Sequence, residues 1–328
     1  MTRLCGVGHE VTLFTSGYPG CKGEEIIDGI RVVRRGDRFS VYRKARAFYE
    51  EKPSSWDVVI DEINTIPFMC PRFVDRGERI VALIHQLARE FWFYELPYPL
   101  AWIGNHVLED RWLKNYRDVV TITVSESTKE ELLGMGFRDV RVVPNGLNAE
   151  TLDMVPPKTP APSMVFVGRL KKTKRPEEAL KAYKIIKEKH PDLHMTVVGD
   201  GDLRKDLEKC YPDVEFTGYL DRASRDAVVS RSWMIAVPGI REGWGQVVTD
   251  SNALGTPAIG YDIPGLRDSI HNGYNGLLSE PTPMAMACEI EKLISDDNLR
   301  STFSENALKW SKRFSWDASA AEFEKVLR

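Results

Sequence analysis

Residues 237–262 read VPGIREGWGQVVTDSNALGTPAIGYD, and this stretch indicates the fold of the second half of the chain. The apolar residues that end at Val237 are typical of a buried strand, and a glycine-rich turn with Glu242 leads into an expected helix. The N–H groups of Gly243–Gln246 would start that helix and form a candidate anion site. Asp250 follows Glu242 by eight residues, about two helical turns. Glu242, as an acid at the start of the expected helix, can also simply interact favourably with the helix dipole.

The same order of strand, tight turn and helix continues outward in both directions and predicts a parallel α/β fold. The expected strands are 10–16, 30–34, 58–61, 79–85, 119–124 and 140–144, then 163–168, 194–199, 214–217, 233–237, 256–260 and 276–278. The expected helices of the second half are 176–190, 201–210, 222–230, 245–254, 283–295 and 299–313. The expected strands are rich in Val and Ile, which is typical of sheets that are covered by helices on both faces.

A proline-rich stretch divides the chain. Residues 149–162 carry four prolines and show no periodicity, which predicts a stiff linker. We therefore expect a Rossmann-like domain over residues 1–148 and a second one over residues 163–312. Two doubly wound domains joined in this way predict a cleft between the carboxyl ends of their strands, where ligands of such sheets bind.

The first domain has an unusual start. Thr2–Gly8 is typical of a helix that ends in a turn, and Glu10 opens a strand directly after it. No strand or glycine-rich turn precedes this helix, although the first strand of a doubly wound domain is central. The expectation is that about 25–35 residues of an ordinary first domain are missing or are replaced by another arrangement.

Composition excludes several classes of protein. The 328 residues suffice for two domains, and a net charge of −3 argues against a dedicated nucleic-acid binder. The five cysteines include no Cys-x-x-Cys pair, which predicts a reducing compartment without disulfides or structural zinc. The first residues lack the apolar segment of a signal peptide, and no stretch is long and apolar enough to span a membrane. We therefore expect a cytoplasmic protein.

The stretch from Glu242 resembles the acid-x7-acid signature of retaining glycosyltransferases of family four, which have the GT-B fold of two Rossmann-like domains. The usual pattern is Glu-Gly-aromatic-Gly, a second Glu eight residues after the first, and Gly-Thr-Pro. This chain has Glu242, Gly243, Trp244 and Gly245, then Asp250 at the position of the second Glu, and Gly255-Thr256-Pro257. The resemblance implies that Glu242 is catalytic and lies against the donor sugar. It also implies that the segment from Gly243 through Trp244 to Gly245 binds the donor and that Asp250 accepts hydrogen bonds from ribose.

A second stretch resembles the phosphate clamp of that family. Gly168 ends an expected strand, Arg169 follows it, and Lys174 comes five residues later. A guanidinium can make forked contacts to a diphosphate, and a lysine adds a point charge. Lys171 and Lys172 can equally belong to a solvated basic loop. Tyr219 follows another expected strand, and the resemblance places it near the nucleotide base.

His85 ends the strand expected at 79–85, where its side chain would reach the ligand edge of the first domain. It can be a core imidazole, but the resemblance implies a catalytic residue at the donor sugar or the reacting centre. Residues 313–328 resemble the family's final helix, which crosses back to the first domain.

The resemblance implies a retaining glycosyltransferase, of hexosyltransferase type, that moves a sugar from a UDP- or GDP-linked donor to a glycan or lipid-linked acceptor. It implies no cofactor beyond this donor and no metal, and the sequence shows no cluster of metal ligands. The alternatives are a non-catalytic nucleotide-sugar-binding or scaffold protein with the same fold, or a GT-B epimerase. A phosphorylase shares the architecture as well.

Two further stretches bear on the acceptor. Residues 91–112 contain seven aromatic residues, and residues 31–46 contain seven basic residues against one acid. Aromatic rings beside cations suit a peripheral contact with the inner face of a membrane or a lipid-phosphate acceptor. A core cluster beside a solvated basic face, or a dimer interface, explains the same residues.

Overall fold

The computed structural model describes residues 1–51, 53 and 55–328. The chain forms two compact units. Unit 1 comprises Met1–Pro144 together with Trp316–Arg328, and unit 2 comprises Asn145–Ser315. Both units are α/β, as the sequence predicts. Over the described residues, no helix is both long and apolar enough to cross a membrane.

Unit 2 is built on one six-stranded parallel sheet with the order β10-β9-β8-β11-β12-β13. The strands are β8 (Ser163–Val167), β9 (His194–Val198), β10 (Glu215–Gly218), β11 (Met234–Val237), β12 (Ala258–Tyr261) and β13 (Gly276–Ser279). Every expected strand of the second half is therefore confirmed, with bounds that differ by one or two residues. The first strand, β8, lies in the middle of the sheet and pairs with β9 and β11.

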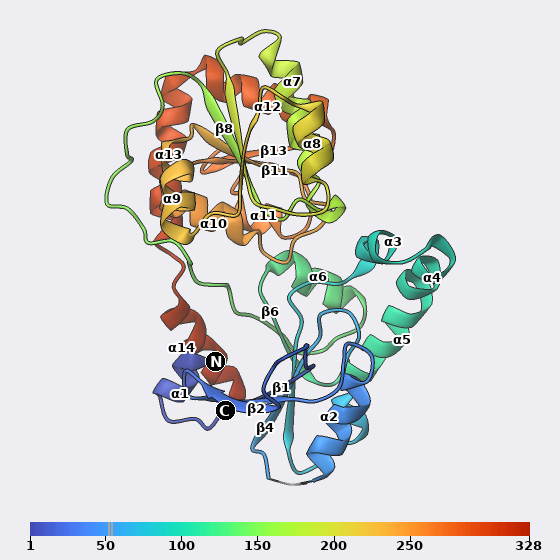
Figure 1. Cartoon of the computed structure of the whole chain (residues 1–328). Coiled ribbons are helices and arrows are strands. Elements are labelled where there is room, and N and C mark those ends of the chain that lie inside the picture. Colours follow the sequence, from blue (N-terminus) through green and yellow to red (C-terminus); the bar gives the residue numbers. More distant parts are fainter. Residues whose placement is uncertain (52, 54) are drawn as a thin grey trace. The chain divides into compact units, whose positions relative to one another are not determined.

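Helices cover both faces of this sheet (Figure 1). They are α7 (Pro176–Lys187), α8 (Arg204–Cys210), α9 (Arg222–Arg231), α10 (Gln246–Ala253), α11 (Leu266–Ser269), α12 (Pro283–Ser295) and α13 (Asp297–Ser311), with the 3-10 turn η5 (Lys172–Lys174). In α7, Pro176 occupies the first turn, and Ala179, Leu180, Tyr183 and Ile186 are buried at helical spacing. These residues pack into the single large core of unit 2.

The segment 149–162, which the sequence predicts as a stiff linker, packs along unit 2. The Leu152 amide donates to the Ala253 carbonyl at 2.9 Å, and the Thr159 amide donates to the Arg231 carbonyl at 3.0 Å. The Lys158 ammonium donates to the Ser230 carbonyl and to Thr256 Oγ1, both at 2.9 Å. The prolines stiffen the segment, and these hydrogen bonds hold it against the unit that follows it.

Unit 1 divides its strands between two sheets. One has the order β1-β3-β2 and the other β4-β5-β6-β7. The strands are β1 (Thr12–Thr15), β2 (Glu24–Ile27), β3 (Ile30–Arg34), β4 (Val58–Glu62), β5 (Arg79–Leu83), β6 (Val120–Thr123) and β7 (Val140–Val142). Only β2 is absent from the expected strands, and it pairs antiparallel with β3 as a hairpin. Within the described ranges, β1 pairs only with β3 and β4 pairs only with β5.

The helices of unit 1 are mostly short. They are α1 (Thr2–Gly6), α2 (Val41–Glu50), α3 (Trp92–Glu95), α4 (Tyr98–Ile103), α5 (Glu109–Leu113), α6 (Glu126–Gly134) and α14 (Trp316–Leu327), with the single turns η1 (Cys70–Arg72), η2 (Arg89–Phe91), η3 (Gly104–Leu108) and η4 (Lys114–Tyr116). The last helix, α14, packs Phe323, Val326 and Leu327 against a cluster that contains Val81 and Ile122 of the sheet. The end of the chain thus belongs to the same unit as its beginning.

Candidate functional site

A pocket of about 330 Å³ lies in unit 2 beside the carboxyl ends of β8 and β11. Carboxyl ends of parallel strands meet at one edge of a sheet, which is where ligands of such sheets bind. The lining comprises Asn148, Phe166, Val167, Gly168, Lys174, Arg225, Asp226, Val229, Ala236, Val237, Pro238, Gly239, Glu242, Gln246, Val247, Asp250, Ser251 and Leu254. Four predicted site residues, Gly168, Lys174, Glu242 and Asp250, therefore share one pocket.

Close backbone approaches shape the sheet edge at this pocket. Gly199, after β9, has φ +135°, and a Cβ there would overlap the carbonyl oxygen of Gly168. The Gly168 amide donates to the Val198 carbonyl at 3.0 Å, and the Gly199 amide donates to the Gly218 carbonyl at 2.8 Å. The ends of β8, β9 and β10 are thereby held together without side chains between them.

The turn before α10 is packed just as tightly. A Cβ at Gly265 would overlap the carbonyl oxygen of Glu242, and a Cβ at Gly239 would lie 2.8 Å from Glu242 Oε1. Gly245 is the N-cap of α10, so the first amides of this helix follow the turn Gly243–Gly245 after Glu242. Because Gln246 lines the pocket, the positive end of the α10 dipole lies at its wall.

Lys174 and Glu242 form an ion pair inside the pocket. Lys174 Nζ donates to Glu242 Oε1 at 2.6 Å, and the Glu242 side chain is 14% exposed. Lys174 ends η5, and Glu242 lies in the turn after β11, so the pair joins two loops that are 68 residues apart. A phosphate could replace or share the carboxylate as the partner of Lys174, since both are oxyanions.

Asp250 is nearly buried and fully hydrogen-bonded. Its Oδ1 accepts from the Asn148 amide at 2.8 Å, the Ala149 amide at 3.3 Å and Gln246 Nε2 at 3.1 Å, and its Oδ2 accepts from Asn148 Nδ2 at 3.3 Å. Asp250 thus anchors the segment that follows Asn145 to α10. To bind a nucleotide as the sequence predicts, Asp250 would have to exchange one of these donors for a ribose hydroxyl.

Three of the predicted donor-binding side chains lie outside the pocket. Arg169 is exposed, directly after Gly168, and Tyr219 is 84% exposed after β10. The Trp244 ring is buried and packs edge-on against Phe314, with 5.1 Å between ring centroids. Trp244 therefore packs on the side of the turn away from the pocket, and Gly243 and Gly245 are not among the residues that line the pocket either.

The sequence analysis missed one charged pair of the pocket wall. Arg225 and Asp226 on α9 both line it and form an ion pair at 2.6 Å. They lie within an expected helix, but no motif singles them out from the other charged residues of α9. Only the packing of α9 beside α10 brings them to the strand ends.

His85 belongs to unit 1. It follows β5, is exposed, and its carbonyl accepts a hydrogen bond from Thr128 Oγ1 at 3.4 Å. Desolvation by neighbouring atoms lowers the pKa of His85, and the negative charge of Glu62 opposes that shift in part. The imidazole is therefore mainly neutral at pH 7 and can accept a proton.

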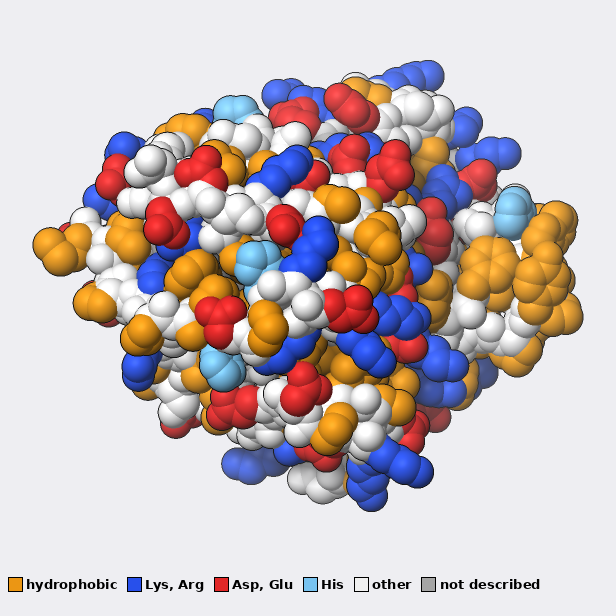
Figure 2. Space-filling model, turned by 90° about the horizontal axis from the view of Figure 1, so that it is seen from above, with side chains coloured by type: hydrophobic (Ala, Val, Ile, Leu, Met, Phe, Trp, Pro, Cys, Tyr) orange, Lys and Arg blue, Asp and Glu red, His pale blue; other side chains and the backbone are white. Residues whose placement is uncertain are grey.

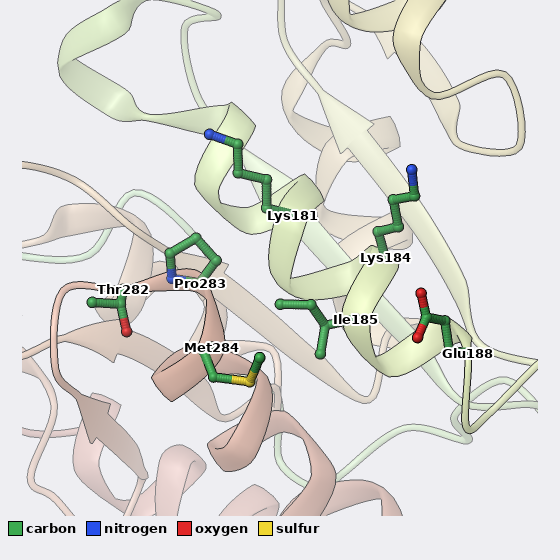
Figure 3. Close-up of a pocket in the computed structure, with 7 residues that line it drawn as sticks. All are labelled: Lys181, Lys184, Ile185, Glu188, Thr282, Pro283 and Met284. Carbon is green, nitrogen blue, oxygen red and sulfur yellow. The ribbon is translucent and has the colours of Figure 1, made fainter.

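Among the residues that the structure describes, no group of three or more His, Cys, Asp or Glu side chains could hold a metal ion. A second hollow, of about 450 Å³, lies between α7 and the start of α12 (Figure 3). Ile185, Pro283 and Met284 form its floor, and Lys181, Lys184 and Glu188 lie around it. It sits on the outer faces of two helices and contains none of the predicted site residues.

Comparisons with known proteins agree with this arrangement. The family model described as Glycosyltransferase Family 4 matches residues 1–151, and that described as Glycosyl transferases group 1 matches residues 152–310. An uncharacterized glycosyltransferase of Methanocaldococcus jannaschii is 28% identical in an alignment of 247 positions that covers 68% of this chain and 63% of that protein. The chain thus spans less than two thirds of that relative.

Solved structures show the same fold. Sucrose-phosphate synthase from Thermosynechococcus elongatus has a TM-score of 0.78 at 19% identity, covering 98% of this chain and 89% of that one. The Anabaena protein HepE, in complex with UDP and glucose, has a TM-score of 0.68 at 16% identity, covering 97% and 98%. The fold class predicted from the sequence is thereby confirmed.

Proposed function

This chain belongs to the group 1 glycosyl transferases with the GT-B fold, and from that premise we propose that it transfers a hexosyl group from a nucleotide diphosphate sugar to a glycan or lipid-linked acceptor. The donor is UDP- or GDP-linked, and the anomeric configuration is retained. The proposal rests on one observation: Lys174, Glu242 and the start of α10 share a pocket at the strand ends of unit 2.

The charges of this pocket suit a departing diphosphate. Negative charge grows on the leaving group as the glycosidic bond breaks, and positioned cations and amides stabilise it. Lys174 and Arg225 supply cations at the wall, and the α10 amides supply a partial positive charge. Arg169, directly after Gly168, can turn its exposed guanidinium toward the phosphates. We propose that these groups balance the leaving charge without a metal ion, so that chelators leave transfer unchanged.

Glu242 would lie beside the sugar rather than the phosphates. In the structure its carboxylate holds Lys174 at 2.6 Å. When the diphosphate takes over Lys174, the carboxylate is left to accept hydrogen bonds from sugar hydroxyls. His85 of unit 1 is assigned to the donor sugar or the reacting centre, as the resemblance implies, and its lowered pKa is compatible with a neutral imidazole there.

Binding and transfer are tested separately. Calorimetric titration with UDP or GDP should show binding by the wild-type chain and about tenfold weaker binding by Lys174→Ala, because a charge-assisted hydrogen bond is lost. Lys172→Ala is the matched control, since Lys172 is exposed in the same 3-10 turn but does not line the pocket. Equal affinities of Lys174→Ala and Lys172→Ala would contradict the phosphate assignment.

Glu242→Gln separates donor binding from sugar transfer. It removes the carboxylate that competes for Lys174, so UDP should bind at least as tightly as to wild type. Transfer to an acceptor should fall by about a hundredfold or more, because the loss is felt mainly in the transition state. Donor binding by wild type without transfer or donor hydrolysis would favour the scaffold alternative, and interconversion of free nucleotide sugars would favour an epimerase.

A further inference from the structure

One segment of unit 1 exposes far more apolar surface than any other. We call residues Arg89–Leu113, from η2 to α5, the arm; α3 and α4 stand away from the four-stranded sheet (Figure 1). Eight large hydrophobic side chains of the arm are 36% to 71% exposed: Phe93, Tyr94, Leu96, Tyr98, Leu100, Trp102, Ile103 and Val107. They are eight of the twenty exposed large hydrophobic residues of the described chain and fall within fifteen positions. A patch of this density marks an interaction site.

The inner side of the arm is firmly fixed, so this exposure is not loose packing. Gly104 lies against the Trp92 ring, where a Cβ would come within 2.8 Å of Cζ3. The buried Glu109 carboxylate accepts from the Ala88 amide at 2.6 Å, the Arg89 amide at 3.0 Å and Trp92 Nε1 at 3.2 Å. These contacts hold both ends of the arm, and Phe93, Tyr94, Tyr98 and Trp102 remain exposed.

The outward side chains form one continuous aromatic face. Trp102 stacks on His106 with 4.9 Å between ring centroids, Phe93 lies 5.9 Å from Tyr98, and Phe93 meets the edge of His106 at 6.4 Å. Figure 2 shows hydrophobic side chains gathered at the right-hand edge, where the arm lies. Between Phe91 and Leu108 the only carboxylate is Glu95, and there is no Lys or Arg.

We propose that the arm docks on an anionic phospholipid bilayer, with its aromatic face in the interfacial region. Trp and Tyr are the side chains that prefer this region, because their rings are apolar and their tips are polar. A helical segment with one aromatic face lies in the plane of the interface and does not cross it. This inference goes beyond the proposed sugar transfer, and it does not depend on it.

The charges at the base of the arm are mixed: the Glu109 carboxylate is buried, Asp110 pairs with Arg89 at 2.7 Å, and two cations remain on the surface. Arg111 and Lys114 are exposed where α5 ends, and neither makes an ion pair with any described residue. Each such cation near an anionic surface contributes favourably to binding. A second copy of the chain fits less well, because a stable interface uses about 20–30 residues a side, and the aromatic face of the arm is far smaller.

Flotation with phospholipid vesicles tests this docking without any sugar donor. The full chain should float with vesicles of phosphatidylcholine and phosphatidylglycerol, and more weakly with phosphatidylcholine alone. Tyr98→Ser/Trp102→Ser should bind both kinds of vesicle about tenfold more weakly. Arg111→Gln/Lys114→Gln should lose about tenfold on the anionic vesicles only. The control is Ile26→Ser/Met284→Ser, which removes two apolar side chains outside the arm that are 77% and 60% exposed.

Three outcomes would contradict the docking of the arm on a bilayer. Wild type that stays in solution with both kinds of vesicle contradicts it, and so does an arm variant that floats like the control. A wild-type dimer that Tyr98→Ser/Trp102→Ser converts to monomers would assign the face to a second copy.

Leu100→Ser/Ile103→Ser serves as an independent arm variant if the first does not fold. Failure of sugar transfer would leave these results unchanged, because Lys174→Ala and Glu242→Gln should float like wild type.

Discussion

The two units arrange similar strands differently. In unit 2 the first strand, β8, has a partner on each side, and all six strands form one sheet. In unit 1 the strands form two sheets, and over the described residues β1 and β4 each pair on one side only. Ile60 of β4 is 37% exposed, although parallel strands are usually covered on both faces.

Because of this difference, we expect the carboxyl edge of the sheet to be more rigid in unit 2 than in unit 1. The continuous sheet of unit 2 lets the turns at Gly168, Gly199 and Glu242 pack against one another. Unit 1 presents His85 beside Glu62 on a four-stranded sheet whose two edge strands are β4 and β7. We expect unit 2 to keep a preformed pocket and unit 1 to open more readily to solvent.

The largest effect is expected at Gly199 of unit 2. Gly199→Ala places a Cβ on the Gly168 carbonyl at a positive φ, so the free energy of unfolding should fall by about 3 kcal/mol or more. Gly273→Ala is the matched control, because Gly273 also has a positive φ but no atom lies within 4 Å of the added Cβ. Urea unfolding measures both variants. Equal losses would show that the strand ends of unit 2 are not tightly packed.

A smaller, local effect is expected at Gly104 of unit 1. Gly104→Ala places a Cβ against the Trp92 ring. Overpacking of this kind should lower the free energy of unfolding by about 2 kcal/mol. The change should lower the stability of unit 1 and weaken vesicle binding, while UDP affinity stays within about twofold of wild type. Hydrogen exchange resolves the two units in one experiment. Destabilisation of unit 2 to the same extent would remove the contrast between them.

The smallest effect concerns pH and the segment along unit 2. Desolvation lowers the pKa of Lys158 to about 7, so from about pH 7 to 10 the unfolded chain binds more protons than the folded chain. Stability from this group therefore rises with pH, by about 1 kcal/mol between pH 7 and 8. The unfolding free energy of wild type minus that of Lys158→Met should therefore rise by that amount over this pH range. A constant difference would mean that Lys158 is not desolvated.

Local sequence was enough to predict the strands of unit 2. The apolar runs of β8 and β9 end at Gly168 and Gly199, and β11 and β12 are apolar because they are buried along their whole length. The sequence analysis did not predict β2, since Glu24–Ile27 begins with two acids and is mostly exposed. Asp28-Gly29, both with positive φ, is a strong hairpin signal that would have found it.

The sequence predicted which residues lie near one another in the site, but it did not predict the directions of their side chains. Glu242, Lys174 and Asp250 share the pocket because the loops after β8 and β11 carry the first two and helix α10, which follows β11, carries the third. The directions of Arg169 and Trp244 depend on packing against other elements, as the contact between Trp244 and Phe314 shows. The roles assigned to these residues stay predictions until a ligand is bound.

Hydrogen–deuterium exchange of the full chain, with and without saturating UDP, tests the central claim most directly. The account predicts slower exchange in residues 168–174 and 242–250 and unchanged exchange at the hollow between α7 and α12. UDP that stabilises the chain but leaves residues 168–174 and 242–250 unprotected would contradict the proposed donor site.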